Sequence, residues 1–151
     1  MAQAANKTIK VEIKRQSTPD GKATTEAFEI PYRPNMNITS LLGEIALNPT
    51  TVTGAATTPI TYDSNCLEEI CGSCAMLING KAMMACSALV DKLEQPIRLA
   101  PLSKFPVVRD LAVDRSVLFE NLKAVKAWVM AGSRLVQSPF IRVTPLLRKT
   151  S

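Results

Sequence analysis

Four cysteines stand between residues 66 and 86 of this chain of 151 residues, and their thiols are the side chains best suited to do chemistry. The run reads Cys66-Leu-Glu-Glu-Ile-Cys71-Gly-Ser-Cys74, and Cys86 follows after eleven further residues. Such a group could form disulfides, bind a structural zinc ion or hold an iron–sulfur cluster. The sequence contains no histidine, which excludes Ser-His-Asp and Cys-His catalysis, imidazole-ligated zinc and Rieske-type clusters.

The spacing of these cysteines favours an iron–sulfur cluster over the two alternatives. Disulfides do not persist in the reducing interior of a cell, and the N-terminus lacks the apolar segment of a secretory signal. Structural zinc sites usually use two separated Cys-x₂-Cys pairs, and this chain has one. The pattern Cys-x₄-Cys-x₂-Cys…Cys is typical of plant-type 2Fe–2S ferredoxins. From the residues alone, a zinc site or no metal at all stay open as alternatives.

The residues around the cysteines suit a cluster held on one tight loop. Gly72 and Ser73 are small at the sharpest bend, where a bulky side chain would collide with inorganic sulfides. Backbone N–H groups of such a bend can point at sulfur and offset its negative charge. The Asn79-Gly80 turn signal predicts a hairpin whose return strand carries Cys86 back to the loop. No other residue offers a nucleophile, a base or a substrate pocket, so the sequence predicts electron transfer.

Composition and charge exclude several other classes of protein. Hydrophobic residues make up 46% and charged residues 21%, a normal globular composition, and no apolar run reaches the roughly 18 residues of a membrane span. The net charge of +5 resides in residues 121–151, which carry six basic and no acidic side chains. Only 5% of residues are aromatic and none lies in a basic stripe, so nucleic-acid binding is not expected. We expect a soluble, intracellular chain.

Hydrophobic periodicity predicts an α+β domain over about the first 100 residues. Strict alternation over residues 8–15 indicates a half-buried strand, and a second strand over 27–30 completes a hairpin. Asn37 or Thr39 can cap a helix that ends before Pro49. The apolar positions of these elements are Ile9, Val11, Ile13, Phe28, Ile30, Ile38, Leu41, Leu42 and Ile45. A loop over 49–59, strands over 75–78 and from the Asn79-Gly80 turn to Cys86, and a strand over 96–99 follow.

A different pattern begins at Ser116, a candidate helix N-cap. From Leu118 on, apolar residues recur at i, i+4, i+7 and i+11. This stripe is interpreted as core rather than as a cofactor contact, although little chain follows to cover it. We therefore also expect the isolated chain to expose an apolar patch. Residues 130–151 show neither helical nor strand periodicity. The stripe consists of Leu118, Leu122, Val125 and Val129, with Phe119 and Trp128 beside it.

From Lys7 to about Trp128 the chain resembles the N-terminal part of the iron–sulfur subunit of succinate dehydrogenase, particularly the type of Gram-positive bacteria. The matching segments are Phe28-Glu-Ile-Pro-Tyr-Arg-Pro-Asn35, Asn65-Cys-Leu-Glu-Glu-Ile-Cys-Gly-Ser-Cys74, Ile78-Asn-Gly-Lys81, Ala85-Cys-Ser-Ala-Leu-Val-Asp-Lys-Leu-Glu-Gln-Pro-Ile-Arg98, Phe105-Pro-Val-Val-Arg-Asp110, Val113-Asp-Arg-Ser116 and Val125-Lys-Ala-Trp128. One departure is Met83-Met84, where relatives often have an arginine and a small polar residue.

The resemblance implies a β-grasp ferredoxin domain with Cys66, Cys71, Cys74 and Cys86 as the ligands of a 2Fe–2S cluster. It implies docking on a flavoprotein subunit that carries FAD and oxidises succinate to fumarate. Single electrons would then pass through 4Fe–4S and 3Fe–4S clusters of a second domain to quinone at a membrane anchor subunit. The implied location is the cytoplasmic side of the bacterial membrane, peripheral through partner subunits. Fumarate reductase, which uses a similar subunit in the opposite direction, is an alternative.

The match ceases after Trp128, and no further cysteine follows. We therefore expect a 2Fe–2S domain over residues 1–104, a linker and helix over 105–129, and a tail outside the family over 130–151. A frameshift or early stop would explain the tail, and the alternative is a genuine short variant with a basic tail. Such a chain alone is expected to be inactive in quinone reduction, because the 4Fe–4S and 3Fe–4S clusters have no ligands in it. A free-standing ferredoxin carrier and a zinc-stabilised interaction module are the other functional classes considered.

Overall fold

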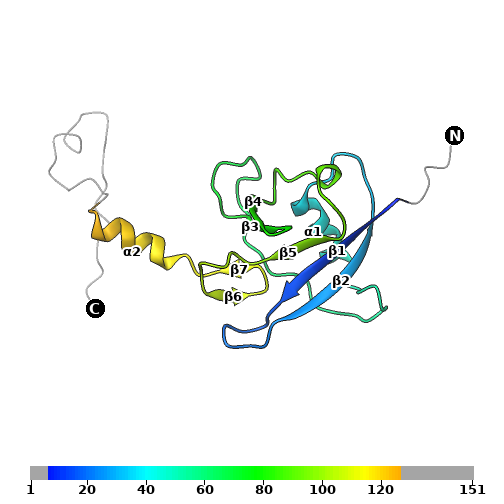
Figure 1. The fold of residues 1–151 in the computed structure, drawn as a ribbon, viewed down its shortest axis with the longest axis horizontal. Helices are drawn as coiled ribbons and strands as arrows, with labels where there is room; N and C mark the ends of the chain where they lie inside the picture. The colour runs from blue at the N-terminus through cyan, green and yellow to red at the C-terminus, as the bar shows by residue number, and fades with distance from the viewer. Residues whose placement is uncertain (1–6, 127–151) are drawn as a thin grey trace, which may run out of the picture. The chain divides into compact units, whose positions relative to one another are not determined.

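The computed structural model describes residues 7–126 of the chain (Figure 1). These residues fall into two units, of which the first ends at residue 114 and the second begins at residue 115. The first unit extends beyond the predicted domain end at residue 104, because residues 105–114 pack onto it. No helix in the described part of the chain combines the length and the apolar character needed to span a membrane.

A five-stranded mixed sheet, in the order β2-β1-β5-β3-β4, forms the centre of the first unit. Strand β1 (Thr8–Arg15) pairs antiparallel with β2 (Thr24–Pro31) and parallel with β5 (Ile97–Ala100). On the far side of β5 lies the antiparallel hairpin of β3 (Ala75–Ile78) and β4 (Lys81–Met84). The predicted strands are present; the second begins three residues earlier than its sequence pattern indicated, and the strand after the Asn79-Gly80 turn ends at Met84, before Cys86.

The turn between β3 and β4 has the backbone conformation that its sequence predicts. Asn79 and Gly80 both adopt positive φ angles, of 48° and 80°, as a two-residue hairpin turn of type I′ requires. The Asn79 side chain also joins this turn to the chain before β5, since its amide donates to the carbonyl oxygen of Glu94 and its oxygen accepts from the Arg98 amide.

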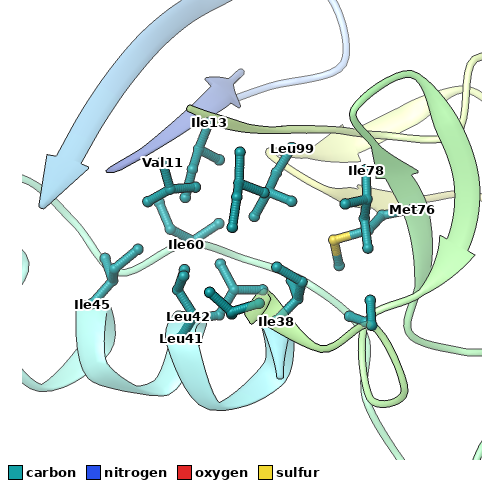
Figure 2. Close-up of a cluster of buried hydrophobic side chains, with 14 of the residues drawn as sticks. Val11, Ile13, Ile38, Leu41, Leu42, Ile45, Ile60, Met76, Ile78 and Leu99 are labelled. Atoms are coloured by element: carbon teal, nitrogen blue, oxygen red, sulfur yellow. The ribbon is translucent and has the colours of Figure 1, made fainter. Parts of the chain in front are cut away.

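Helix α1 (Ile38–Leu47) covers one face of the sheet (Figure 1). Its N-cap is Asn37, whose Oδ1 accepts a hydrogen bond from the Ser40 amide at 2.8 Å; this confirms one of the two predicted caps. The helix ends at Leu47, before Asn48 and Pro49. Figure 2 shows its apolar face pointing toward side chains of the strands. Four fully buried residues form that face, namely Ile38, Leu41, Leu42 and Ile45.

The core between helix and sheet is built from the inward positions of β1, β2, β3 and β5, as the alternation predicts. Each fully buried aliphatic side chain contributes about 1.5–3 kcal/mol relative to an exposed one. The core includes Ile9, Val11, Ile13, Phe28, Met76, Ile78, Ile97 and Leu99, and both Cys74 and Cys86 lie at its margin among the buried residues.

Residues 105–114 form a second, two-stranded sheet that the sequence analysis did not predict. Strand β6 (Val107–Arg109) pairs with β7 (Ala112–Val113), and Asp110 between them is 2% exposed. Its carboxylate accepts hydrogen bonds from the Arg15 side chain at 2.9 Å and from the Thr61 amide at 3.0 Å. The buried Arg15 guanidinium also contacts Glu26 of β2, so one ion network joins both ends of the unit.

Helix α2 (Ser116–Ala124) belongs to the second unit. The structure places Arg115 at the N-cap position, so the predicted cap at Ser116 is wrong by one residue. None of the helical residues is buried, and the interpretation of their apolar stripe as core is therefore wrong over the described residues. The expected apolar patch is present: Val117, Leu118, Phe119, Leu122 and Val125 are between 46% and 72% exposed. Trp128, Val129 and the predicted tail lie outside the described residues.

Candidate iron–sulfur site

The fold brings the four cysteines to one end of the β3–β4 hairpin. We define the cysteine loop as residues 66–74; Cys66 and Cys71 lie within it, and Cys74 is its last residue, directly before β3. Ala75 and Met84 face each other across the hairpin, so the segment that follows β4 returns to Cys74. The amide of Ala85 donates to the Cys74 carbonyl oxygen at 3.2 Å, and all four thiols are free.

Cys86 is not on a strand, which corrects the prediction that the return strand reaches it. Strand β4 ends at Met84. The chain then turns, because the amides of Ser87 and Ala88 both donate to the Met84 carbonyl oxygen, at 3.3 and 3.1 Å. This turn directs Cys86 inward, where it is buried.

The Cys66 sulfur lies in a ring of backbone amides. The N–H groups of Glu68, Ile70 and Cys71 donate to its Sγ at 3.4, 3.4 and 3.3 Å. Left-handed φ angles at Leu67 (60°) and Glu69 (59°) turn these amides inward, and concave groups of backbone N–H bind anions. The sequence predicted that backbone amides of the bend at Gly72 and Ser73 donate to sulfur. The three amides that donate to the Cys66 Sγ belong to residues before that bend.

Gly72 is required by its backbone conformation. Its φ is +72°, a value that residues with a Cβ rarely adopt. Beyond its two chain neighbours, no protein atom lies within 4 Å of the position a Cβ would take. The backbone angle, and not a lack of space within the protein, is therefore the reason for glycine here. Beside it, the Ser73 hydroxyl and the Cys71 Sγ are 3.1 Å apart.

The environment of the cysteine loop favours the thiolate form of its most exposed cysteine. The hydrogen bond with the Ser73 side chain, followed by the backbone amides and the Cys66 side chain, lowers the pKa of Cys71 to about 6. Thiolates are the form that binds iron. At the buried end, desolvation raises the pKa of Cys86, and its hydrogen bond with Cys74 acts in the same direction.

The cysteines influence one another's ionisation. The amide of Cys71 donates to the Cys66 Sγ at 3.3 Å, and Cys66 contributes to the lowered pKa of Cys71. Cys74 and the charge of Cys66 add to the desolvation that raises the pKa of Cys86. Tyr62 lies close enough to Cys74 for the thiolate charge to raise its pKa further, in addition to burial. Within residues 7–126, no three cysteine, aspartate or glutamate side chains converge as ligands of one metal ion would.

Three polar contacts around the thiols were not anticipated from the sequence. The Asn37 side-chain amide donates to the Cys86 carbonyl oxygen at 2.8 Å, so the N-cap of α1 also contacts this segment. The Ser87 hydroxyl donates to the Glu69 carboxylate at 2.8 Å, and Ser73 contacts Cys71 as described above. Asn37 had a signal in the sequence as a helix cap, and Ser73 as a small residue of the bend; contacts across 18 and 49 residues require the fold.

A family model described as a 2Fe-2S iron-sulfur cluster binding domain matches residues 10–120, which include all four cysteines. The chain belongs to this family. A 2Fe–2S cluster is therefore the cofactor of the domain, and its donor set fits: four free thiols, amides turned toward sulfur, and a neighbouring hydroxyl.

Two relatives of the 2Fe–2S protein confirm the resemblance found in its sequence. The succinate dehydrogenase iron-sulfur subunit of Bacillus subtilis is 60% identical over 123 residues, which are 82% of this chain and 49% of that protein. The fumarate reductase iron-sulfur subunit of Escherichia coli O6:H1 is 30% identical over 132 residues, which are 87% of this chain and 51% of that protein. The chain thus spans about half the length of each.

Solved structures support the fold of the 2Fe–2S protein. A chain of the Mycobacterium smegmatis Sdh1 complex in the apo form superposes with a TM-score of 0.67 at 22% identity, covering 93% of this chain and 55% of that one. A hypothetical protein from Helicobacter pylori gives a TM-score of 0.57 at 16% identity, covering 90% and 24%. The predicted α+β, ferredoxin-like fold is confirmed.

Proposed function

We propose that the chain transfers single electrons through a 2Fe–2S cluster bound by Cys66, Cys71, Cys74 and Cys86, as an iron–sulfur subunit of succinate dehydrogenase. The observation that carries this proposal is the placement of four free thiols on one loop and the turn beside it, with three backbone amides donating to the Cys66 Sγ, inside the segment that the 2Fe-2S family model matches. When bound, the cluster accepts and releases one electron at a time.

The residues around the cysteines would bind this cluster and form hydrogen bonds with its ligand sulfurs. The amides of the cysteine loop donate to the Cys66 sulfur, and the Ser73 hydroxyl, 3.1 Å from the Cys71 Sγ, can donate to a thiolate there; such bonds stabilise the added negative charge of the reduced state. Cys74 and Cys86 anchor the inner side in the core. Cys71 at the exposed side brings the centre near the surface, where a donor can approach.

The electron donor we propose is the FAD of a flavoprotein subunit that oxidises succinate to fumarate. The 60% identity to the Bacillus subtilis subunit supports this assignment. In the intact complex the chain would be held at the cytoplasmic side of the membrane through partner subunits that include a membrane anchor. Fumarate reduction is the second direction considered, and the 30% identity to the Escherichia coli subunit favours it less.

Coexpression with the flavoprotein subunit of the same organism tests this function. The tagged chain should purify with a stoichiometric flavin subunit, and succinate should produce the EPR signal of a reduced 2Fe–2S centre. A Cys71→Ala chain, which should fail to hold the cluster, is the matched control for the signal. A cluster-loaded chain that neither binds the flavoprotein nor accepts electrons from succinate would instead indicate a free-standing carrier.

A further inference from the structure

The two segments that carry the thiols are joined by a side-chain contact outside the ligand set. The cysteine loop holds three cysteines and the turn after β4 holds the fourth, 12 positions after Cys74. Between them, the Glu69 carboxylate accepts a hydrogen bond from the Ser87 hydroxyl at 2.8 Å. Ser87 directly follows Cys86, so this bond acts on the backbone that positions the fourth thiol.

The backbone of Glu69 lies in an uncommon conformation. Its φ is 59°, in the left-handed region that residues with a long side chain rarely adopt. A glycine would adopt this angle more readily, so the glutamate side chain is present at a conformational cost.

We propose that Glu69 is a positioning residue whose carboxylate, through Ser87, fastens the cysteine loop to the segment of Cys86 and keeps the four thiols assembled around the cluster. This inference rests on the proposed ligand set. The hydrogen bond is exposed to water, because both residues are exposed, so its net contribution is that of an ordinary hydrogen bond. The effect on cluster retention is correspondingly moderate.

Glu69 also places a negative charge beside the cluster. Its hydrogen bond and its charge can therefore be tested separately, the first by the rate of cluster loss and the second by the reduction potential. A nearby carboxylate disfavours the addition of an electron, so removing its charge raises the reduction potential. Glu69→Gln removes the charge and keeps an oxygen that accepts from Ser87. Glu69→Ala removes both, and Ser87→Ala removes the hydrogen bond while the charge stays.

The experiment compares cluster loss from the full chain in the presence of an iron chelator, followed by visible absorbance. Glu69→Ala and Ser87→Ala should each lose the cluster about 2- to 10-fold faster than the wild type, and the double variant no faster than either. Glu69→Gln should retain it as the wild type does. Asp63→Ala, which removes another exposed acid three residues before Cys66, is the matched control and should have no effect.

The reduction potential gives the second readout. Glu69→Gln and Glu69→Ala should both shift the equilibrium about 2- to 10-fold toward the reduced form, which corresponds to about 20–60 mV for one electron. Ser87→Ala should leave the potential close to that of the wild type. Equal rates of cluster loss in Glu69→Gln and Glu69→Ala would overturn the proposal, because the hydrogen bond would then not matter.

Hydrogen exchange of the metal-free chain distinguishes failure of this inference from failure of the proposed function. The amides of residues 68–71 should exchange faster in Glu69→Ala and Ser87→Ala than in the wild type or Glu69→Gln. Unchanged exchange in all variants would contradict the role of Glu69. A wild-type chain that assembles no cluster would contradict the proposed function, and exchange would still decide the role of Glu69.

Discussion

Cys71 is a proposed ligand, and hydrogen bonds from its surroundings, first that of the Ser73 side chain, lower the pKa of its thiol to about 6. We expect Cys71→Ala to abolish the cluster, since alanine offers iron no donor atom in place of the thiolate. Iron content per chain should fall from about two to near zero. Visible absorbance and iron analysis of anaerobically prepared protein measure this.

Met83→Ala is the matched control for that variant. Met83 lies on the hairpin close to the ligands in sequence, but its side chain is 36% exposed. Its removal should leave the cluster assembled. Retention of full iron by Cys71→Ala, or loss of iron by Met83→Ala, would contradict the assignment of the ligands.

Asp110 is the buried residue whose loss should cost most stability outside the apolar core. Its carboxylate faces Arg15, which is itself buried, and breaking a buried ion pair by removing one partner costs about 3–5 kcal/mol. We expect Asp110→Ala to lower the free energy of unfolding by about that amount. Asp110→Asn, which keeps an acceptor for Arg15, should cost less; equal stability of all three chains in urea would refute the role of the network.

The same carboxylate makes stability depend on acidic pH. Burial by itself raises the pKa of Asp110, but the hydrogen bonds from Arg15, Thr61 and Gln16 outweigh it and hold the pKa below its ordinary value. A folded-state pKa below the unfolded one stabilises the fold above about pH 4, the unfolded pKa. This contribution is lost as pH falls from there through the folded pKa. Urea unfolding should show the stability difference between wild type and Asp110→Asn shrinking below about pH 4.

The proposed ligands stand out in the sequence, whereas their hydrogen-bond partners do not. Cysteine spacing is a local pattern, so Cys66, Cys71 and Cys74 could be proposed as ligands from a nine-residue segment. Glu69 looks like one of two ordinary acids in that segment, and its contact with Ser87 arises only once the hairpin has folded. Arg15, at the end of an alternating strand, likewise gave no sign that it would be buried.

Helix α1 connects the core to the site through its first residue. Asn37 caps the helix with its side-chain oxygen and contacts the Cys86 carbonyl with its nitrogen. We expect Asn37→Ala to destabilise the fold by about 1 kcal/mol through the lost cap. Asn37→Asp keeps the cap and loses the donor, so it should be nearly as stable as wild type yet lose its cluster faster; identical behaviour of both variants would contradict the two roles.

Elements long enough to show a regular hydrophobic pattern were predictable from the sequence. Very short strands, and boundaries that depend on tertiary hydrogen bonds, were not. The alternation of β1 and the four apolar positions of α1 specify burial over eight to ten residues. Strands β6 and β7 have three and two residues, too few to show an alternation. The end of β4 at Met84 follows from turn hydrogen bonds, whereas the sequence suggested a strand continuing to Cys86.

The whole chain should associate through helix α2. Its apolar side chains are exposed over the described residues, and exposed apolar patches promote association. We expect the isolated chain to self-associate at micromolar concentration, and Phe119→Ser combined with Leu122→Ser to reduce this without changing the thermal stability of the first unit. Sedimentation velocity and thermal unfolding measure both. A monodisperse wild-type chain with α2 amides protected from exchange would contradict the expectation.

The iron and acid-labile sulfide content of the anaerobically purified full chain tests the central claim most directly. If the four cysteines bind a 2Fe–2S cluster, the chain contains about two irons and two labile sulfides, and it gives a rhombic EPR signal after reduction. A stoichiometric zinc content without labile sulfide would contradict the account.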